Sequence, residues 1–334
     1  MNRKIVGAIA SLAVILTLLP AVPAQAGHGN TTSGLPYGGV NTHITYFGTV
    51  YDDPENLAQL MKVLEAKQYR DAVNPDQGQG YYDKFNLAVR RIREVAGSRL
   101  IAGTVRSYYT PSQTKQVLDQ YAPLIAEGHI IAIEGANEPN GDTSNWVQET
   151  RAHQCDLYKQ VKARWPNLTV IGPSMSLDSS GLNNSGTPGA QLGDLSHCMD
   201  LGNFHFYARH TGIDTRYLAR RWEDSGIIAG WQDGSGDPMI ATEANGIYGC
   251  ESPYTGSTAE SQRLGMIDLY NLLAKLPYGG AHRVFAYELL DGTVLHQKPA
   301  CHSENNYGMY RKLADGRWEA KPVFFPVRDA NRRG

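Results

Sequence analysis

The chain has 334 residues, and its 31 Lys and Arg against 33 Asp and Glu give a formal net charge of −2. This length suffices for one domain with a large core, since an α/β barrel needs about 250 residues. A nearly balanced charge without a long basic run argues against nucleic acid as a partner.

The first 26 residues have the pattern of a secretory signal peptide. A basic start is followed by an apolar run over residues 5–19 and by the small-residue exit Ala24-Gln25-Ala26. The run is shorter than the about 20 residues of a membrane span, and no second run of this kind follows. We therefore expect residues 1–26 to be removed and residues 27–334 to be secreted, without a membrane partner. An uncleaved N-terminal anchor is the alternative.

Short β-rich segments alternate with amphipathic helical patterns over the rest of the chain, which is typical of βαβ units. Helix starts are marked by caps, as at Asp53-Pro54, Thr110-Pro111 and Thr258. The predicted strands are, in chain order, Thr42–Phe47, Tyr69–Val73, Leu100–Val105, Ile130–Glu134, Thr169–Gly172, Leu201–Tyr207, Met239–Glu243 and Val284–Leu290.

Eight such units can close into a barrel or form an open, doubly wound sheet. No Gly-x-Gly-x-x-Gly turn follows the first strand, and polar and aromatic residues follow many strands rather than one. This distribution favours an α/β fold of the (β/α)8 TIM-barrel type in a single domain, 27–334. The polar stretches Asn74–Gly80 and Ser176–Gly189 are expected as long loops at the carboxyl ends of the strands.

Two predicted strands lead into a glutamate. The fourth continues into Asn137-Glu138-Pro139, and the seventh ends in Glu243. Opposed strands of a barrel can bring two carboxylates face to face, and retaining glycoside hydrolysis needs two carboxyl groups about 5–5.5 Å apart. The competing interpretation is a pair of solvated or capping carboxylates. Glu134 competes for the acid role, but its place inside an apolar strand favours a buried, paired acid.

The Asn137-Glu138-Pro139 motif together with Glu243 resembles glycoside hydrolase clan A, and the resemblance extends over the whole of residues 27–334. It implies a retaining enzyme that cleaves O-glycosidic bonds of a poly- or oligosaccharide by double displacement. With the signal-peptide pattern of residues 1–26, this enzyme is expected to be secreted. Glu138 would be the general acid/base and Glu243 the nucleophile. The carbohydrate would be the only partner, with no cofactor and a monomeric chain.

The resemblance also implies roles for four neighbours of the two glutamates. A His-x-Tyr pattern on the sixth strand is matched by His205 and Tyr207, with the tyrosine bonded to the nucleophile and the histidine near the acid/base. Asn137 would bind the sugar 2-hydroxyl, and Arg70 would pair with the nucleophile. The alternatives are a buried histidine beside a packing tyrosine, and a structural pair of Arg70 with Asp71.

The eighth strand departs from the clan pattern. Many members have a tryptophan there that forms the floor of the sugar site, whereas this chain has Tyr287. A tyrosine ring also offers a flat face for a sugar, so Tyr287 is the expected substitute.

Four cysteines in an exported chain indicate two disulfides, because their spacing fits no zinc site. Three pairings are possible from the sequence. The expected barrel layout favours Cys250–Cys301, which would follow adjacent strands, and Cys155–Cys198.

Two other functions remain open from the sequence. A non-catalytic carbohydrate-binding barrel would use the glutamates only as hydrogen-bond acceptors, but it would not need two opposed carboxylates. An esterase or peptidase would need a Ser or Cys nucleophile, and no Gly-x-Ser-x-Gly motif is present.

Overall fold

The computed structural model describes residues 38–176, 187–208, 212–231, 236–246, 258–277, 280–281, 283–292 and 305–333. The expected signal peptide and the expected Cys250–Cys301 pair lie outside these residues. Within them, no helix combines the length and the apolar character that a membrane crossing requires.

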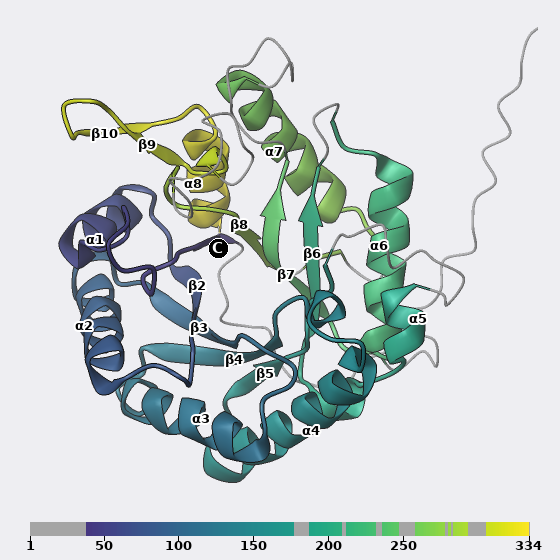
Figure 1. Cartoon of the computed structure of the whole chain (residues 1–334). Helices are drawn as coiled ribbons and strands as arrows, with labels where there is room; N and C mark the ends of the chain where they lie inside the picture. Colours follow the sequence, from purple (N-terminus) through teal and green to yellow (C-terminus); the bar gives the residue numbers. More distant parts are fainter. Residues whose placement is uncertain are drawn as a thin grey trace, which may run out of the picture.

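Parallel strands form the centre of the molecule (Figure 1). Their order is β5-β4-β3-β2-β1-β8-β7-β6, and the two outer strands meet through an isolated parallel bridge between Ile171 and Leu201. The predicted (β/α)8 barrel is therefore confirmed. The strands are β1 (Gly38–Asn41), β2 (Gln68–Val73), β3 (Arg99–Thr104), β4 (Ile130–Ala136), β5 (Thr169–Ile171), β6 (Gly202–Tyr207), β7 (Met239–Asn245) and β8 (Val284–Ala286).

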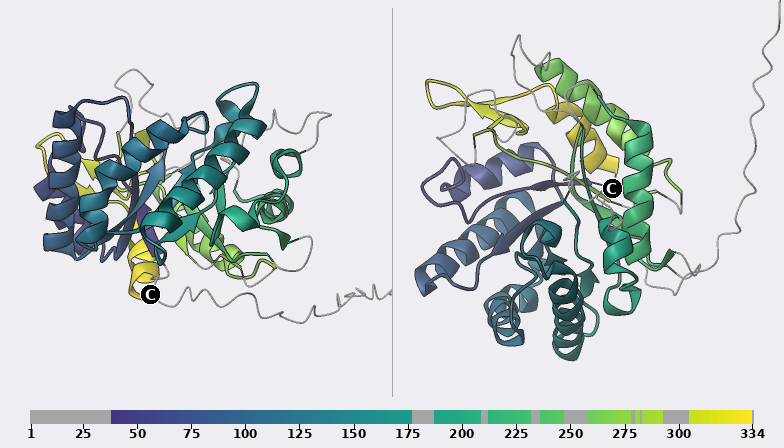
Figure 2. Two further views of the ribbon diagram at one scale, coloured as in Figure 1. Left: turned by 90° about the horizontal axis from the view of Figure 1, so that it is seen from below. Right: turned by 45° about the vertical axis from the view of Figure 1, so that its right-hand side comes forward.

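Helices surround this sheet, as both figures of the whole chain show (Figures 1 and 2). The predicted caps are present: Asp53 accepts from the Asn56 amide, and Thr110 and Thr258 form capping boxes. The helices are α1 (Pro54–Val63), α2 (Gln79–Ala96), α3 (Pro111–Ala126), α4 (Trp146–Arg164), α5 (Pro188–Leu192), α6 (Thr215–Ile228), α7 (Ala259–Leu273) and α8 (Phe324–Arg333), with 3-10 turns η1 (Pro139–Gly141) and η3 (Ser196–Cys198) and a small hairpin of β9 (Tyr310–Lys312) and β10 (Trp318–Ala320).

The alternation of side chains along each strand divides the core into two parts. Leu100 and Ala102 of β3 belong to the large cluster shared with the helices, whereas Ile101 between them belongs to a separate cluster of strand residues. That smaller cluster fills the barrel interior and contains Ile101, Ala132, Ile171, Leu201, Ile240 and Phe285. The barrel is therefore packed with apolar side chains below the level at which the polar residues begin.

The first predicted strand, Thr42–Phe47, is wrong, because β1 is the preceding segment Gly38–Asn41. Its glycines permit close packing: a Cβ on Gly38 would lie 2.5 Å from Asn331 Oδ1, and a Cβ on Gly39 would lie 2.3 Å from the Phe285 ring. The eighth predicted strand, Val284–Leu290, is too long, since β8 ends at Ala286.

Two long loops were expected after the second and fifth strands. The first is shorter than predicted, because Gly78 already caps α2. Most of the second, Ser176–Gly189, lies outside the described residues, and its end forms the start of α5.

Helix α8 packs on the outside of the barrel against β1 and α7. The left view of Figure 2 shows it at one end of the molecule beside β1. Its Phe324, Val327 and Ala330 are buried, and the Asn331 amide donates to the Leu64 carbonyl oxygen at 3.0 Å.

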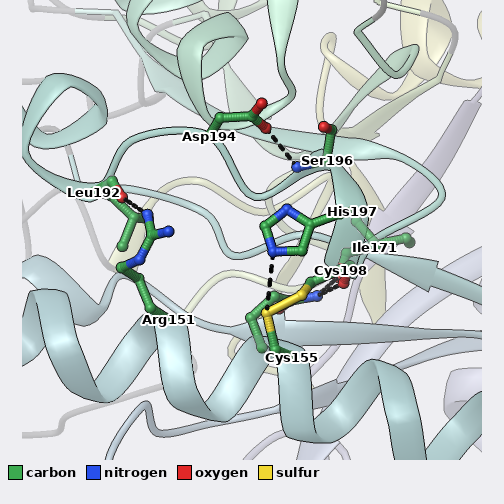
Figure 3. Close-up of a disulfide and its surroundings, with 9 residues drawn as sticks. Arg151, Cys155, Ile171, Leu192, Asp194, Ser196, His197 and Cys198 are labelled. Atoms are coloured by element: carbon green, nitrogen blue, oxygen red, sulfur yellow. Dashed lines mark hydrogen bonds between the residues drawn. A yellow bond between two sulfur atoms is a disulfide. The ribbon is translucent and has the colours of Figure 1, made fainter.

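The predicted disulfide between Cys155 and Cys198 is present (Figure 3). It connects the middle of α4 with η3, which directly precedes β6. His197 Nε2 lies 3.9 Å from Cys155 Sγ. The bond therefore joins the two sides of the β5–β6 junction.

Candidate active site

The Asn137-Glu138-Pro139 segment begins where β4 ends. The Glu138 amide donates to the Ser174 carbonyl oxygen at 3.0 Å, which fixes the segment beside the end of β5. Glu138 itself has the left-handed backbone conformation, with φ 48° and ψ 47°, and Pro139 starts η1. Non-glycine residues adopt this conformation rarely, and it is found preferentially at functional sites.

Glu243 lies on β7 with its side chain 10% exposed. Arg70 Nη1 donates to Oε1, and the Tyr207 hydroxyl donates to Oε2. Burial alone would raise the pKa of this carboxyl, but the charges of His205 and Arg70 and the bond from Tyr207 outweigh it and lower the pKa to about 2. Glu243 is therefore ionised over the whole range in which most proteins are stable.

Glu138 faces Glu243 across the barrel mouth and is more accessible, with its side chain 31% exposed. His205 Nδ1 lies 3.1 Å from Glu138 Oε1 and 3.6 Å from Glu243 Oε2. One ligand atom from each of these three residues lies within 4.8 Å of the others. Two carboxylates and an imidazole at this spacing can share a proton, flank a small substrate group, or ligate a cation.

Arg70 connects the predicted residues. Besides Glu243, it donates through Nη2 to Asn137 Oδ1 at 2.6 Å and through Nε to Glu134. Its neighbour Asp71 instead accepts from Thr42 Oγ1 at 2.8 Å. The alternative of a structural Arg70–Asp71 pair therefore does not describe this chain.

Glu134 is fully buried, as its place inside an apolar strand indicates. Its carboxylate accepts from Arg70, from Asn203 Nδ2 at 2.8 Å and from Thr242 Oγ1 at 2.8 Å. A carboxylate with all of these donors is a structural partner of Arg70 and has no access to substrate.

Tyr287 directly follows β8 and is 7% exposed. Its ring contacts Tyr207 and Tyr307 edge-on, with centroids 5.5 Å and 5.6 Å apart. Tyr307 was not among the predicted residues. The expected sugar platform is therefore part of an aromatic cluster beside Glu243, and its role in binding stays a prediction.

A second polar pair next to the site escaped the sequence analysis. His43 Nε2 lies 3.2 Å from Glu288 Oε2, with side chains 17% and 0% exposed, and 3.2 Å from the Tyr287 hydroxyl. Burial acts to lower the pKa of His43, but the hydrogen bond and charge of Glu288 outweigh it and raise the pKa. His43 follows β1, whose position was predicted wrongly.

Asn41 is a further residue that the sequence analysis missed. It is buried at the end of β1, accepts from Arg70 Nη1 at 3.2 Å and donates to the Thr242 carbonyl oxygen at 2.9 Å. Asn41 therefore supports both Arg70 and β7 from the barrel interior.

No protein-family model and no curated protein matches the sequence. Similar solved structures include a β-galacturonidase from Eisenbergiella tayi (17% identity, TM-score 0.59, 89% of this chain and 51% of that chain) and a β-glucuronidase from Dictyoglomus thermophilum (12%, 0.61, 90% and 51%). A family 39 glycoside hydrolase from Bacteroides cellulosilyticus is also similar (15%, 0.56, 88% and 63%).

These neighbours are glycoside hydrolases, and this chain spans about half to two thirds of their length. At such low identity the likeness establishes the TIM-barrel fold. It is consistent with the resemblance to clan A seen in the sequence, and it assigns no particular family.

Proposed function

We propose that the protein is a secreted retaining glycoside hydrolase that cleaves O-glycosidic bonds of a poly- or oligosaccharide. The observation that carries the proposal is the pairing of Glu138 and Glu243, with carboxylate oxygens within 4.8 Å of each other. This spacing is close to the about 5–5.5 Å of retaining enzymes and well below the about 6.5–9.5 Å that leaves room for a water in inverting enzymes.

The two glutamates also differ in environment as the two roles require. Glu243 is nearly enclosed and accepts from Arg70 and Tyr207, which suits an ionised nucleophile. Glu138 is more exposed and contacts His205 Nδ1, a partner that can take or return a proton.

The reaction follows in two displacements. Glu138 donates its proton to the glycosidic oxygen while Glu243 attacks the anomeric carbon, so that the bond to the leaving group breaks and a glycosyl-enzyme ester forms. The ionised Glu138 then removes a proton from water, which attacks the same carbon and releases Glu243. Asn137, held by Arg70, would bind the sugar 2-hydroxyl, and Tyr287 would offer a face to the ring.

Activated aryl glycosides test the two roles without knowledge of the natural substrate. Glu243→Ala should abolish turnover, because the covalent route is lost. Glu138→Ala should still form the intermediate, since an activated leaving group needs no proton. Azide should then restore turnover and yield a glycosyl azide with the anomeric configuration of the substrate.

In Glu243→Ala, azide should give only the inverted anomer. An inverted product from Glu138→Ala and a retained product from Glu243→Ala would reverse the two assignments. Full activity in both variants would contradict the proposal and place the active site elsewhere. No hydrolysis by the wild type, together with equilibrium binding to the same sugars, would favour a carbohydrate-binding protein.

Export forms part of the proposal. The support is the signal-like pattern of residues 1–26, whose exit is Ala24-Gln25-Ala26. Expression in a secreting host should give extracellular protein that begins at Gly27, as read by N-terminal mass spectrometry. Retention of the full chain in the cell fraction would contradict it.

A further inference from the structure

A buried polar chain runs beneath the acid/base glutamate across three strands. His205 on β6 contacts Glu138 Oε1 through Nδ1 at 3.1 Å and Thr242 Oγ1 through Nε2 at 3.0 Å. Thr242 on β7 lies 2.8 Å from Glu134 Oε1 and 2.7 Å from Asn203 Oδ1. His205, Thr242 and Glu134 are 0% exposed, so no bulk water can substitute for a missing partner.

The hydrogens of this chain can be assigned from the neighbours of Thr242. Asn203 Nδ2 donates to Glu134 Oε1 and to the Gly172 carbonyl oxygen, while its Oδ1 accepts from the Phe204 amide. The amide orientation is thus fixed, and Oδ1 can only accept. Glu134 is ion-paired with Arg70 and also accepts.

The Thr242 hydroxyl has one hydrogen and two close acceptors. If it donated to His205 Nε2, both Glu134 Oε1 and Asn203 Oδ1 would face an oxygen at 2.7–2.8 Å with no hydrogen between them. Each of the two oxygens also accepts from another N–H, but two buried oxygen–oxygen contacts this short without a hydrogen between them repel, and donation to either oxygen relieves one contact. The hydroxyl must therefore donate to one of them, and its lone pair is left to accept from His205 Nε2.

We infer that Thr242 is a positioning residue that holds the neutral His205 ring as the Nε2–H tautomer and so presents the lone pair of Nδ1 to Glu138. A protonated Glu138 can donate to this lone pair, whereas an ionised Glu138 gains no hydrogen bond from it. These hydrogen bonds therefore favour the protonated form of Glu138 before the first displacement. This consequence rests on the proposed glycosidase function, but the tautomer does not.

The charged and titratable groups around the ring are few. Glu138 and Glu243 face Nδ1, at 3.1 Å and 3.6 Å, and Glu134 lies 4.0 Å from Nε2. Arg70 binds Glu243 Oε1, and the Tyr207 hydroxyl binds Oε2, the oxygen that lies 3.6 Å from Nδ1. Two carboxylates next to Nδ1 would attract a hydrogen there, so the bond to Thr242 is what opposes the other tautomer.

The tautomer is measurable without a substrate. In protein labelled with 15N in its histidine rings, the neutral His205 ring should show hydrogen on Nε2, and the His205→Asn spectrum identifies its signals. Thr242→Val removes the acceptor of Nε2 and should move the hydrogen to Nδ1, whereas Thr242→Ser keeps the hydroxyl and should match the wild type. Hydrogen on Nδ1 in the neutral ring of the wild type would overturn the inference, whether or not the valine variant folds.

Kinetics test the consequence for Glu138. In Thr242→Val the Nδ1 hydrogen stabilises ionised Glu138, so the basic limb of the kcat/KM profile should move down by about 1–2 pH units. Thr242→Ser should keep the wild-type limb. Loss of rate without movement of the limb would contradict a role through His205. If no glycoside is hydrolysed, the proposed function fails while the NMR spectrum still decides the tautomer.

Discussion

Tyr207 combines a hydrogen bond to Glu243, the proposed nucleophile, with packing against other aromatic rings. It donates to Glu243, and its ring contacts Tyr287 and Tyr307. Tyr207→Phe removes the bond and keeps the ring. Because a hydrogen bond to a charged group contributes about 1.5–3 kcal/mol, kcat/KM should fall about 10- to 100-fold.

The same substitution should raise the pKa of Glu243 from about 2, so the acidic limb of the kcat/KM profile should move to higher pH. Tyr158→Phe is the matched control, since that hydroxyl contacts Asp200 away from the site. An acidic limb that stays in place in Tyr207→Phe would show that Arg70 and His205 suffice to keep Glu243 ionised.

Glu243 also links stability to pH. Its pKa is about 2 in the folded protein against an ordinary value of 4.5, so its contribution is complete above about pH 4.5 and is lost as the pH falls toward 2. Glu243→Gln should remove this part of the acid destabilisation. Urea unfolding at about pH 5 and about pH 3 measures it. Glu319→Gln is the control, since that side chain is 44% exposed and pairs with Arg311 on the β9–β10 hairpin. An equal loss of stability in wild type and Glu243→Gln would contradict the linkage.

Among single residues, the sequence predicted those site residues that lie at the ends of apolar strands. Glu138, Glu243 and Tyr207 could be located because an apolar run ends at or beside each of them. His43 and Glu288 could not, because their pairing joins the segments after β1 and β8 and leaves no periodic trace in the sequence. The sequence allows Arg70 to pair with either Glu243 or Asp71. Only the direction of its guanidinium group, which points to Glu243, decides between them.

At the scale of elements, β1 shows why one strand was misplaced. Gly38 and Gly39 have low β-propensity and no side chains to form a pattern, yet Asn331 and Phe285 approach their Cα atoms so closely that a Cβ would collide. The more β-like residues from Thr42 onward form the irregular segment that carries His43. Gly38 and Gly39 therefore fit this strand because of close packing, which a pattern of β-propensity does not reveal.

Strand β4 offers a test of the same kind of packing near Glu138. A Cβ on Gly135 would lie 2.0 Å from Gln154 Oε1 and 3.1 Å from the Pro173 nitrogen. Gln154 cannot move away cheaply, because it is buried and its Nε2 donates to the Cys198 carbonyl oxygen at 2.9 Å. Gly135→Ala should therefore lower the free energy of unfolding by about 1–3 kcal/mol in urea titrations.

Gly141→Ala is the matched control, since nothing lies within 4 Å of a Cβ at that position. It should change the free energy of unfolding by no more than about 0.5 kcal/mol. Equal effects of the two substitutions would contradict the packing argument for β4.

At the scale of the molecule, the disulfide strengthens the barrel where its sheet is weakest. Cys155 and Cys198 are 43 residues apart in sequence. Replacing both by alanine should lower the free energy of unfolding by about 2–4 kcal/mol. Peptide mapping without reduction should first show the 155–198 cross-link in the wild type, and a double variant as stable as the wild type would show that the backbone bridge suffices.

The junction between β5 and β6 also has a mechanical consequence. It divides the sheet into one arm that ends in β4 and β5 and another that ends in β7 and β6, so Glu138 and Glu243 stand on opposite sides of it. Widening this junction by about 2 Å would take the carboxylates from the spacing for direct attack toward the spacing that admits a water molecule. In the proposed retaining reaction, the backbone bridge at this junction and the disulfide beside it would therefore help to keep the two carboxylates at the spacing for direct attack.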